Sequence, residues 1–316
     1  MGKIAFVFPG QGSQSVGMGQ DLYNSLPAAK AYFDRADTAL GFSLSNLIFQ
    51  GPEDQLKITY HTQPALLTTS IACLEAFKAA GITPDYVAGH SLGEYSALVA
   101  AGVLAFEDAV RTVRARGEFM EQAVPGGLGA MAAVLGAERA ALAELCTVIT
   151  SSGSVVELAN VNCPGQIVVS GSKEGVAAVV ERCKEAGAKR AIPLEVSGPF
   201  HSSLMKPASE RLADVLASIE MQEAAVPVVA NVTARPVTQP SDIRGLLVEQ
   251  VYSPVLWEDT ITYLIGEGVD TFIELGSGSV LAGLIKKVDR TVKTVSIGSL
   301  EALEKFTQEV HDHVNG

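Results

Sequence analysis

The chain has 316 residues, of which 47% are hydrophobic and 18% are charged, enough to bury a large core in one domain or in a domain with a subdomain. Its formal net charge of −12 argues against a general nucleic-acid-binding protein, because such proteins need a basic face to displace counterions from phosphates. The four cysteines show no C-x-x-C spacing, so neither disulfides nor a metal site are expected.

The N-terminal segment predicts a buried strand. Five apolar residues, Ile4 to Phe8, precede the turn Pro9-Gly10-Gln11-Gly12. They are too few for a signal peptide or a membrane span. We therefore expect a cytoplasmic protein that does not associate with membranes.

The next segments predict helices on either side of a short strand. Pro64 suits a first helical position and Gly81 a C-cap, so a helix is expected between them. The apolar run 86–88 leads into Gly89, and further helices are expected over residues 92–101 and 107–122.

The stretch from residue 126 to residue 197 has a different rhythm. Strands are expected over residues 130–135, 155–161, 166–170 and 190–196, and helices over 138–145 and 173–185. The order βαββαβ is that of a ferredoxin-like unit. We therefore predict a subdomain at residues 126–197, inserted into an α/β core formed by residues 1–125 and 198–316.

After residue 198 the alternation of strand and helix resumes. Strands are expected over residues 226–230, 271–275 and 294–297, and helices over 245–251, 257–265 and 280–287. Strands and helices that alternate in this way favour an α/β fold with a largely parallel sheet.

Gly89-His90-Ser91-Leu92-Gly93 is a G-x-S-x-G pattern, which alone is a modest signal. One alternative is that Ser91 does no more than cap the helix that follows. The strand before it and the helix after it, however, are the setting of a nucleophilic serine on a tight turn. A helix N-terminus also favours the negative charge that develops beside such a serine.

A serine nucleophile needs a base, which is most often histidine. The histidines of this chain are His61, His90, His201, His311 and His313. His90 adjoins Ser91 and should point away from it, and the last two histidines lie in a polar tail. His201 lies in a Gly-Pro loop at the end of the predicted subdomain, where clefts tend to form. It is therefore the best candidate.

Arg116 lies on the apolar face of the 107–122 helix, between Val113 and Met120. An arginine there can snorkel or pair with a core carboxylate. It can also grip a carboxylate of the substrate through a bidentate bond worth about 1.5–3 kcal/mol. The residues alone leave both interpretations open, and the second would indicate a dicarboxylic acyl group.

Several motifs in the same order resemble the malonyl-CoA:acyl carrier protein transacylase family of bacterial fatty acid synthesis. The acyltransferase domains of polyketide synthases are similar, but less closely so. The resemblance runs nearly end to end and depends on Phe8-Pro9-Gly10-Gln11-Gly12-Ser13-Gln14, Thr62-Gln63-Pro64-Ala65, Gly89-His90-Ser91-Leu92-Gly93-Glu94, Arg116-Gly117, Asn162-Cys163-Pro164-Gly165-Gln166 and Pro199-Phe200-His201.

The resemblance implies a hydrolase-like core with an inserted ferredoxin-like subdomain. It implies that Ser91 attacks the malonyl thioester and that His201 accepts the proton. The backbone N–H groups of Gln11 and Leu92 would form the oxyanion hole. Arg116 would hold the free malonyl carboxylate.

The resemblance also implies that a main-chain carbonyl near Gln250, rather than an aspartate, orients His201. The bulk of Phe200 favours malonyl over methylmalonyl. Further candidates for the site are Gln63, Met120 and Asn162. The family commonly has Gly-Pro-Gly where this chain has Gly276-Ser277-Gly278, a turn outside the catalytic set, so this departure bears on local rigidity alone.

The expected function is ping-pong transfer of a malonyl group from malonyl-CoA to the phosphopantetheine thiol of acyl carrier protein, by a monomer and without cofactors. Acyl carrier protein is acidic, so its docking needs a local basic patch. Candidates are Lys189, Arg190, Lys286, Lys287 and Arg290, and ordinary solvated charges explain these residues equally well.

Other functions remain to be weighed. A serine esterase or thioesterase would place its histidine late in the chain, as His311 or His313. An acyltransferase of a polyketide pathway is a second alternative. A nucleotide-binding module that uses Gly10-Gln11-Gly12 is not favoured, because the Gly-Lys-Ser/Thr of a P-loop is missing.

Overall fold

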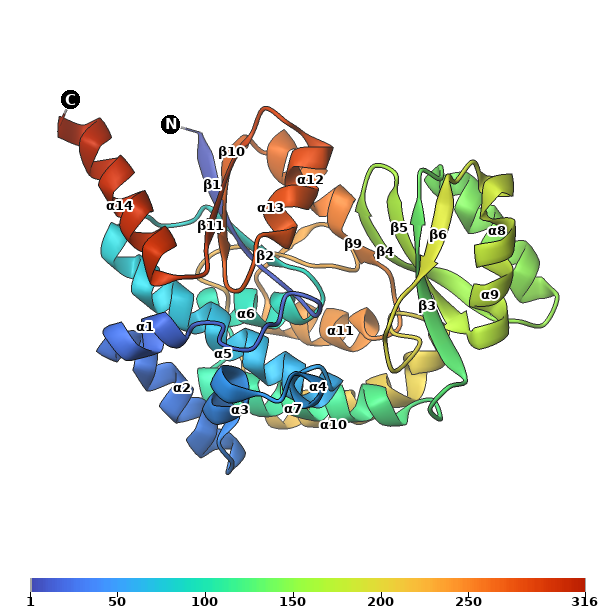
Figure 1. Ribbon diagram of the computed structural model, residues 1–316, viewed down its shortest axis with the longest axis horizontal. Coiled ribbons are helices and arrows are strands. Elements are labelled where there is room, and N and C mark those ends of the chain that lie inside the picture. The colour runs from blue at the N-terminus through green and yellow to red at the C-terminus, as the bar shows by residue number, and fades with distance from the viewer. Residues whose placement is uncertain (1, 316) are drawn as a thin grey trace.

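The computed structural model describes the backbone of residues 2–315 and the side chains of residues 2–309. It contains two sheets (Figure 1). The first sheet has the strand order β11-β10-β1-β2-β7-β8, in which all neighbours are parallel except β7 and β8. Its strands are β1 (Lys3–Phe8), β2 (Tyr86–Gly89), β7 (Val228–Val229), β8 (Pro236–Val237), β10 (Val269–Leu275) and β11 (Lys293–Ile297). An α/β fold with a largely parallel sheet is therefore confirmed.

Strand β1 lies at the centre of the first sheet and is buried on both faces. Phe6 and Phe8 join the larger apolar core, whereas Ala5 and Val7 face a smaller one on the opposite side. Helices α5 (Thr59–Phe77), α6 (Leu92–Ala100), α7 (Phe106–Gln122) and α11 (Pro240–Gln250) cover the larger core. Helices α12 (Trp257–Gly266) and α13 (Val280–Val288) cover the smaller one.

Six helices have no counterpart among those expected from the sequence. They are α1 (Gln20–Ser25), α2 (Pro27–Leu40), α3 (Leu44–Gln50), α4 (Glu53–Leu56), α10 (Lys206–Ser218) and α14 (Leu300–Asn315). Each contributes buried side chains to the larger core, such as Phe33 of α2 and Leu212 of α10. None of the helices in the described part of the chain is apolar over a length that would cross a bilayer.

The second sheet has the order β6-β3-β5-β4-β9 and is antiparallel apart from the pair β4–β9. Its elements are β3 (Gly129–Leu135), α8 (Arg139–Ser151), β4 (Val156–Cys163), β5 (Gln166–Ser172), α9 (Lys173–Arg182), β6 (Arg190–Pro193) and β9 (Val255–Leu256). Helices α8 and α9 bury one face of this sheet (Figure 1). On the other face, Met131 and Val168 join the core of the first sheet. Strand β9 lies between β8 and β10 in the chain, and both of these belong to the first sheet, yet β9 pairs with β4. The part of the chain that builds the first sheet therefore also contributes a strand to the second.

Helix α5 begins at Thr59, so the prediction that it begins at Pro64 is wrong. A proline inside a helix cannot donate to the carbonyl four residues earlier, which here belongs to Tyr60. Arg114 of α7 donates to this carbonyl instead, at 3.2 Å. A contact between helices therefore replaces the missing local bond, and α5 continues through the proline. The short 3-10 turns are η1 (Lys78–Ala80), η2 (Cys183–Ala186) and η3 (Ser203–Met205).

Gly117 lets α7 approach α5 closely. A Cβ at this position would stand 2.5 Å from Tyr60 Cα and 3.0 Å from Thr59 O, which are both backbone atoms of α5. Gly283 on α13 differs, because a Cβ there would meet nothing within 4 Å. Alanine substitutions at these two glycines therefore distinguish the effect of helix packing, at Gly117, from the effect of helix propensity, at Gly283.

We expect Gly117→Ala to lower the free energy of unfolding by about 1–3 kcal/mol, because the added methyl group forces the two helices apart. Gly283→Ala should raise it by about 0.5–1 kcal/mol, since alanine is the better helix former. Urea unfolding of both variants measures these changes. A neutral Gly117→Ala would contradict the close approach of α5 and α7.

Candidate active site

Ser91 lies on a strained turn between β2 and α6, with φ 51° and ψ −107°. The turn is tight because Gly89 and Gly93 lack side chains. A Cβ on Gly89 would stand 1.9 Å from Gly93 C, and a Cβ on Gly93 would stand 2.1 Å from Phe8 O. Although Ser91 is the N-cap residue of α6, its side chain does not cap the helix. The alternative that this serine is a simple cap is therefore wrong.

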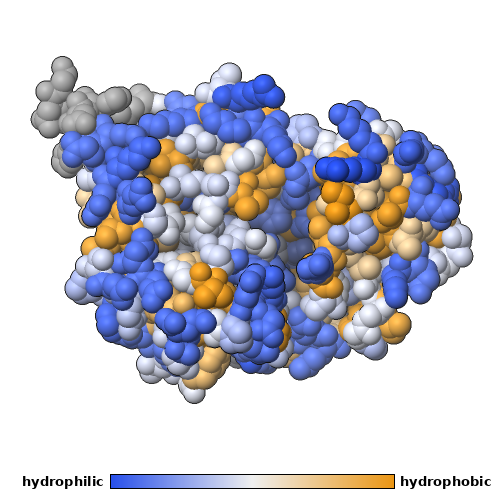
Figure 2. All heavy atoms as spheres, viewed as in Figure 1, coloured by the Kyte–Doolittle hydropathy of each residue, from blue (hydrophilic) through white to orange (hydrophobic). Residues whose placement is uncertain are grey.

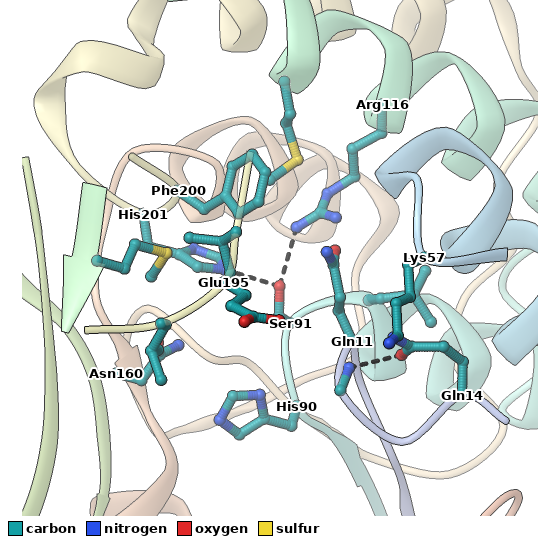
Figure 3. A pocket seen from close by; sticks show the side chains of 16 residues that line it. Gln11, Gln14, Lys57, His90, Ser91, Arg116, Asn160, Glu195, Phe200 and His201 are labelled. Carbon is teal, nitrogen blue, oxygen red and sulfur yellow. Dashed lines mark hydrogen bonds between the residues drawn. The ribbon is translucent and has the colours of Figure 1, made fainter. Parts of the chain in front are cut away.

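His201 is the partner of the Ser91 hydroxyl. Ser91 Oγ and His201 Nε2 are 2.7 Å apart, and His201 Nδ1 is 2.8 Å from Gln250 O (Figure 3). A main-chain carbonyl accepts hydrogen bonds and cannot donate them, so Nδ1 carries the proton. Nε2 therefore accepts from Ser91, which is the arrangement of a nucleophile with its base.

The imidazole of His201 is buried and neutral. Its exposed fraction is 4%, and burial, followed by the nearby charge of Arg116, lowers its pKa to about 3. The Gln250 carbonyl opposes this change. His201 Nε2 is therefore unprotonated at neutral pH, and its lone pair accepts the hydrogen bond from Ser91.

Arg116 reaches the same hydroxyl from α7. Its exposed fraction is 1%, and Nη2 donates to Ser91 Oγ at 3.1 Å and to Gln250 Oε1 at 3.0 Å. Nη1 donates to Gln63 Oε1 at 2.7 Å, and Nε has no hydrogen-bond partner among the described residues. Arg116 forms no ion pair with any described carboxylate. The interpretation that it pairs directly with a core carboxylate is therefore wrong.

Two backbone N–H groups beside Ser91 have no hydrogen-bond acceptor among the described residues. They belong to Gln11, in the turn after β1, and to Leu92, the first residue of α6. Both residues line the pocket that contains Ser91. The N–H of Ser91 itself donates to Asn231 Oδ1 at 2.7 Å and is already used.

The pocket has a volume of about 340 Å³ and lies between the two sheets, where the surface in Figure 2 is hollowed. Phe200 and Met120 line it together with Met131 of β3. Gln63 contacts the guanidinium of Arg116, and its Oε1 accepts from Nη1. Lys57 and Gln14 lie on the opposite side from Phe200 (Figure 3). Within the described residues, no group of three or more His, Cys, Asp or Glu side chains could hold a metal.

Asn162 is not brought to Ser91. Its Oδ1 is 2.8 Å from His90 Nε2, and the His90 ring packs on Trp257 at 5.6 Å between centroids. The His90 side chain points away from the Ser91 hydroxyl, as expected (Figure 3). Asn162 therefore links β4 of the second sheet to the turn that carries Ser91.

Two residues near Ser91 were missed by the sequence analysis. Glu94 is buried on α6, and Asn231 follows β7. The signals were the one charged residue in the run from Leu92 to Ala100, and a polar residue at the carboxyl end of a parallel strand, where sites gather in α/β folds.

The chain is similar to known acyl transferases over nearly its whole length. The acyl transferase domain family matches residues 5–313. A malonyl CoA-acyl carrier protein transacylase of Bacillus subtilis is 59% identical, over 99% of this chain and 98% of the relative. An acyl carrier protein S-malonyltransferase structure from Vibrio cholerae has a TM-score of 0.94 and 44% identity, over 96% of this chain and 99% of that one. A malonyl-transacylase solved with its type II polyketide synthase acyl carrier protein has a TM-score of 0.94 and 42% identity, over 97% and 99% of the two chains.

The buried imidazole makes stability depend on pH. An unfolded chain protonates His201 below its ordinary pKa of 6.5, whereas the folded chain keeps it neutral down to about 3. Unfolding therefore takes up a proton in this range. The contribution of His201 to the free energy of unfolding is present above pH 6.5 and is lost as the pH falls toward 3.

We expect His201→Asn to flatten the fall in the free energy of unfolding between about pH 7 and about pH 5. Urea unfolding at the two pH values measures the slope. His61→Asn, at a partly exposed histidine, is the matched control and should change the slope less. An unchanged slope in His201→Asn would show that the folded imidazole is not held neutral.

Proposed function

The chain belongs to the acyl transferase domain family, and from that membership we propose that it transfers a malonyl group from malonyl-CoA to acyl carrier protein through Ser91. One observation carries the chemistry. Ser91 Oγ lies 2.7 Å from a neutral imidazole and 3.1 Å from a buried guanidinium in one pocket. The printed names of the relatives support malonyl-CoA as donor and acyl carrier protein as acceptor. The transfer supplies the extender unit for fatty acid synthesis.

The first half-reaction forms the acyl-enzyme. Ser91 Oγ attacks the thioester carbonyl while His201 Nε2 takes its proton. The N–H groups of Gln11 and Leu92 stabilise the oxyanion of the tetrahedral intermediate. When the C–S bond breaks, the imidazolium returns the proton to the departing CoA sulfur. The thioester is already an activated acyl donor, so the reaction needs no cofactor.

The second half-reaction runs the same steps in reverse with another thiol. The phosphopantetheine thiol of acyl carrier protein gives its proton to His201 Nε2 and attacks the malonyl-Ser91 ester. The Oγ–C bond breaks, and Ser91 regains its proton from the imidazolium. Because CoA leaves before acyl carrier protein takes the malonyl group from Ser91, the order is ping-pong.

Arg116 selects the acyl group. A malonyl group bound to Ser91 ends in a carboxylate. Arg116 offers it a buried Nε with no partner among the described residues, and the Nη2 hydrogen that binds Ser91 Oγ in the free enzyme would turn to the carboxylate. A bidentate bond from this edge would orient the carboxylate. Gln63 and Gln250 keep the guanidinium in place by accepting from its other hydrogens. Phe200 lines the same pocket and limits the space for an α-methyl group.

An acidic carrier protein needs a basic surface near the pocket, and two basic clusters meet at one end of the second sheet. The Lys189 N–H donates to Leu135 O at 2.7 Å, and Leu135 pairs with Gln166. Lys287 Nζ donates to Gln166 Oε1 at 3.2 Å. The proposed docking surface therefore consists of Lys189, Arg190 and Lys287, whereas Lys286 donates to main-chain carbonyls, one of them that of Arg290.

The organisation of the chain supports a division into two parts. Residues 126–197 contain β3, α8, β4, β5, α9 and β6 in the order of a ferredoxin-like subdomain, and residues 1–125 and 198–316 form the hydrolase-like core. The esterase alternative is not favoured, because His201 faces Ser91, while the side chains of His311 and His313 lie outside the described residues. The similarity to a polyketide-type malonyl-transacylase keeps the polyketide pathway as a second candidate.

We expect Ser91→Ala to abolish covalent malonylation, because Ser91 supplies the only hydroxyl bound to His201 Nε2 among the described residues. Intact-mass measurement after mixing with malonyl-CoA detects the acyl-enzyme directly. The wild-type protein should gain one malonyl group, and Ser91→Ala none. A malonyl adduct that persists in Ser91→Ala would overturn the assignment of the nucleophile.

We expect Arg116→Ala to lower kcat/KM for malonyl-CoA by about 10- to 100-fold, the loss of one charge-assisted bidentate bond. Turnover of acetyl-CoA, which has no free carboxylate, should fall less, so the preference for malonyl should shrink. Arg111→Ala is the matched control, because Arg111 is exposed on the same helix and pairs with Asp108. Equal losses on both substrates would mean that Arg116 is structural.

A further inference from the structure

Glu94 is a buried carboxylate that the proposed mechanism does not use. Its exposed fraction is 2%, and it forms no ion pair with the described residues. Oε2 accepts from Gln250 Nε2 at 2.8 Å and from Asn231 N at 3.1 Å. Burying a carboxylate without a contacting cation costs free energy, which points to a role for Glu94 in positioning the residues that it binds.

The two residues that Glu94 holds both grip the backbone of Ser91. Asn231 Oδ1 accepts from Ser91 N at 2.7 Å, and Gln250 Nε2 donates to Ser91 O at 3.0 Å. Asn231 Nδ2 also donates to Gly89 O at 2.7 Å. Both main-chain polar groups of the strained serine are thus fixed by side chains from distant parts of the chain. A strained backbone persists only where its surroundings fix it in this way.

The turn that delivers Asn231 is itself strained. Among the described residues, the non-glycine residues with positive φ are Ser91, His201 and Ala234. Ala234 has φ 51°, and its N–H donates to Ala230 O at 2.9 Å, closing the turn that carries Asn231. The main chain of Asn231 is held on both sides, because its O accepts from Leu256 N at 3.0 Å. This turn therefore places Asn231 with little freedom.

Gln250 lies between a carboxylate and a guanidinium. Its Nε2 faces Glu94 and its Oε1 faces Arg116. The reversed amide would set oxygen against carboxylate and N–H against guanidinium, so the two charges fix one orientation. Burial raises the pKa of Glu94 to about 7, and the bonds from Asn231 and Gln250 and the charge of Arg116 oppose this rise. The orienting charge is therefore present above neutral pH.

We propose that Glu94 is a positioning residue for acyl transfer. It anchors Asn231 and the Gln250 amide, and through them it holds the backbone of Ser91 and the guanidinium of Arg116. The inference rests on the proposed function of Ser91. Glu94 touches neither the substrate nor the reacting atoms, so its effect is carried entirely by these two side chains.

The test compares Glu94→Gln and Glu94→Ala in single-turnover acylation of Ser91 by malonyl-CoA, followed by intact mass at about pH 8, where the wild-type carboxylate is ionised. Gln keeps one acceptor oxygen for both donors but loses the charge, so the rate should fall about tenfold. Ala leaves both donors without their common acceptor, and the rate should fall about 100-fold. Because Gln and Glu have nearly the same volume, the loss in Glu94→Gln cannot come from a cavity, and it separates a positioning role from loss of volume.

Glu274→Gln is the matched control. Glu274 is also buried, at 1% exposure, and accepts from Leu281 N and Ala282 N at the start of α13, outside the pocket. Its variant should lose stability in urea as Glu94→Gln does, yet acylate Ser91 at the wild-type rate. If Glu94→Ala does not fold, Glu94→Gln decides the outcome.

Two results would overturn the proposal. One is acylation of Glu94→Gln at the wild-type rate, and the other is an equal loss in Glu274→Gln, which would trace the effect to general destabilisation. The wild-type protein and Ser91→Ala, run in parallel, test the proposed function by itself. A wild-type protein that gains no malonyl group would refute that function, whereas a normal wild-type rate with unaffected Glu94 variants would refute the role of Glu94 alone.

Discussion

The burial of Arg116 beside the Ser91 hydroxyl is the constraint on which the candidate site depends. A guanidinium with an exposed fraction of 1% has lost its water, and burial lowers its pKa. No described carboxylate touches it, so neutral oxygens from Gln63, Gln250 and Ser91 replace that water. Those acceptors must come from α5, α11 and the turn after β2. The close packing of α5 on α7 at Gly117 follows from the same requirement.

The site also depends on the place where the two sheets meet. His201 follows β6, the edge strand of the second sheet, and its partner, Gln250 O, lies a few residues before β9, which joins the same sheet. The imidazole is therefore held between a chain that returns from the second sheet and one that is about to enter it. Asn162 of β4 adds a third link by binding His90 next to the nucleophile.

Much of the fold could be read from local patterns, because alternating strands and amphipathic helices carry a period of their own. The apolar face of α7 predicted that Arg116 points toward the core, and Gly89 and Gly93 indicated the tight turn at Ser91. Other features depend on distant contacts and left no local signal. Pro64 stays inside α5 because Arg114 supplies a donor, and Asn231 meets Glu94 across 137 residues of chain. The early helices α1 to α4 owe their burial to the same tertiary packing.

Gln250 uses its main chain for the imidazole and its side chain for the guanidinium. Every amino acid has a carbonyl, so a substitution at this position leaves the acceptor for His201 chemically intact. Natural variation at residue 250 would therefore change the side-chain contacts with Arg116, Glu94 and the Ser91 carbonyl, but it would leave the acceptor of His201 unchanged. In other serine enzymes an aspartate side chain accepts from the catalytic histidine. Here a main-chain carbonyl does so, and a comparison of sequences cannot identify it.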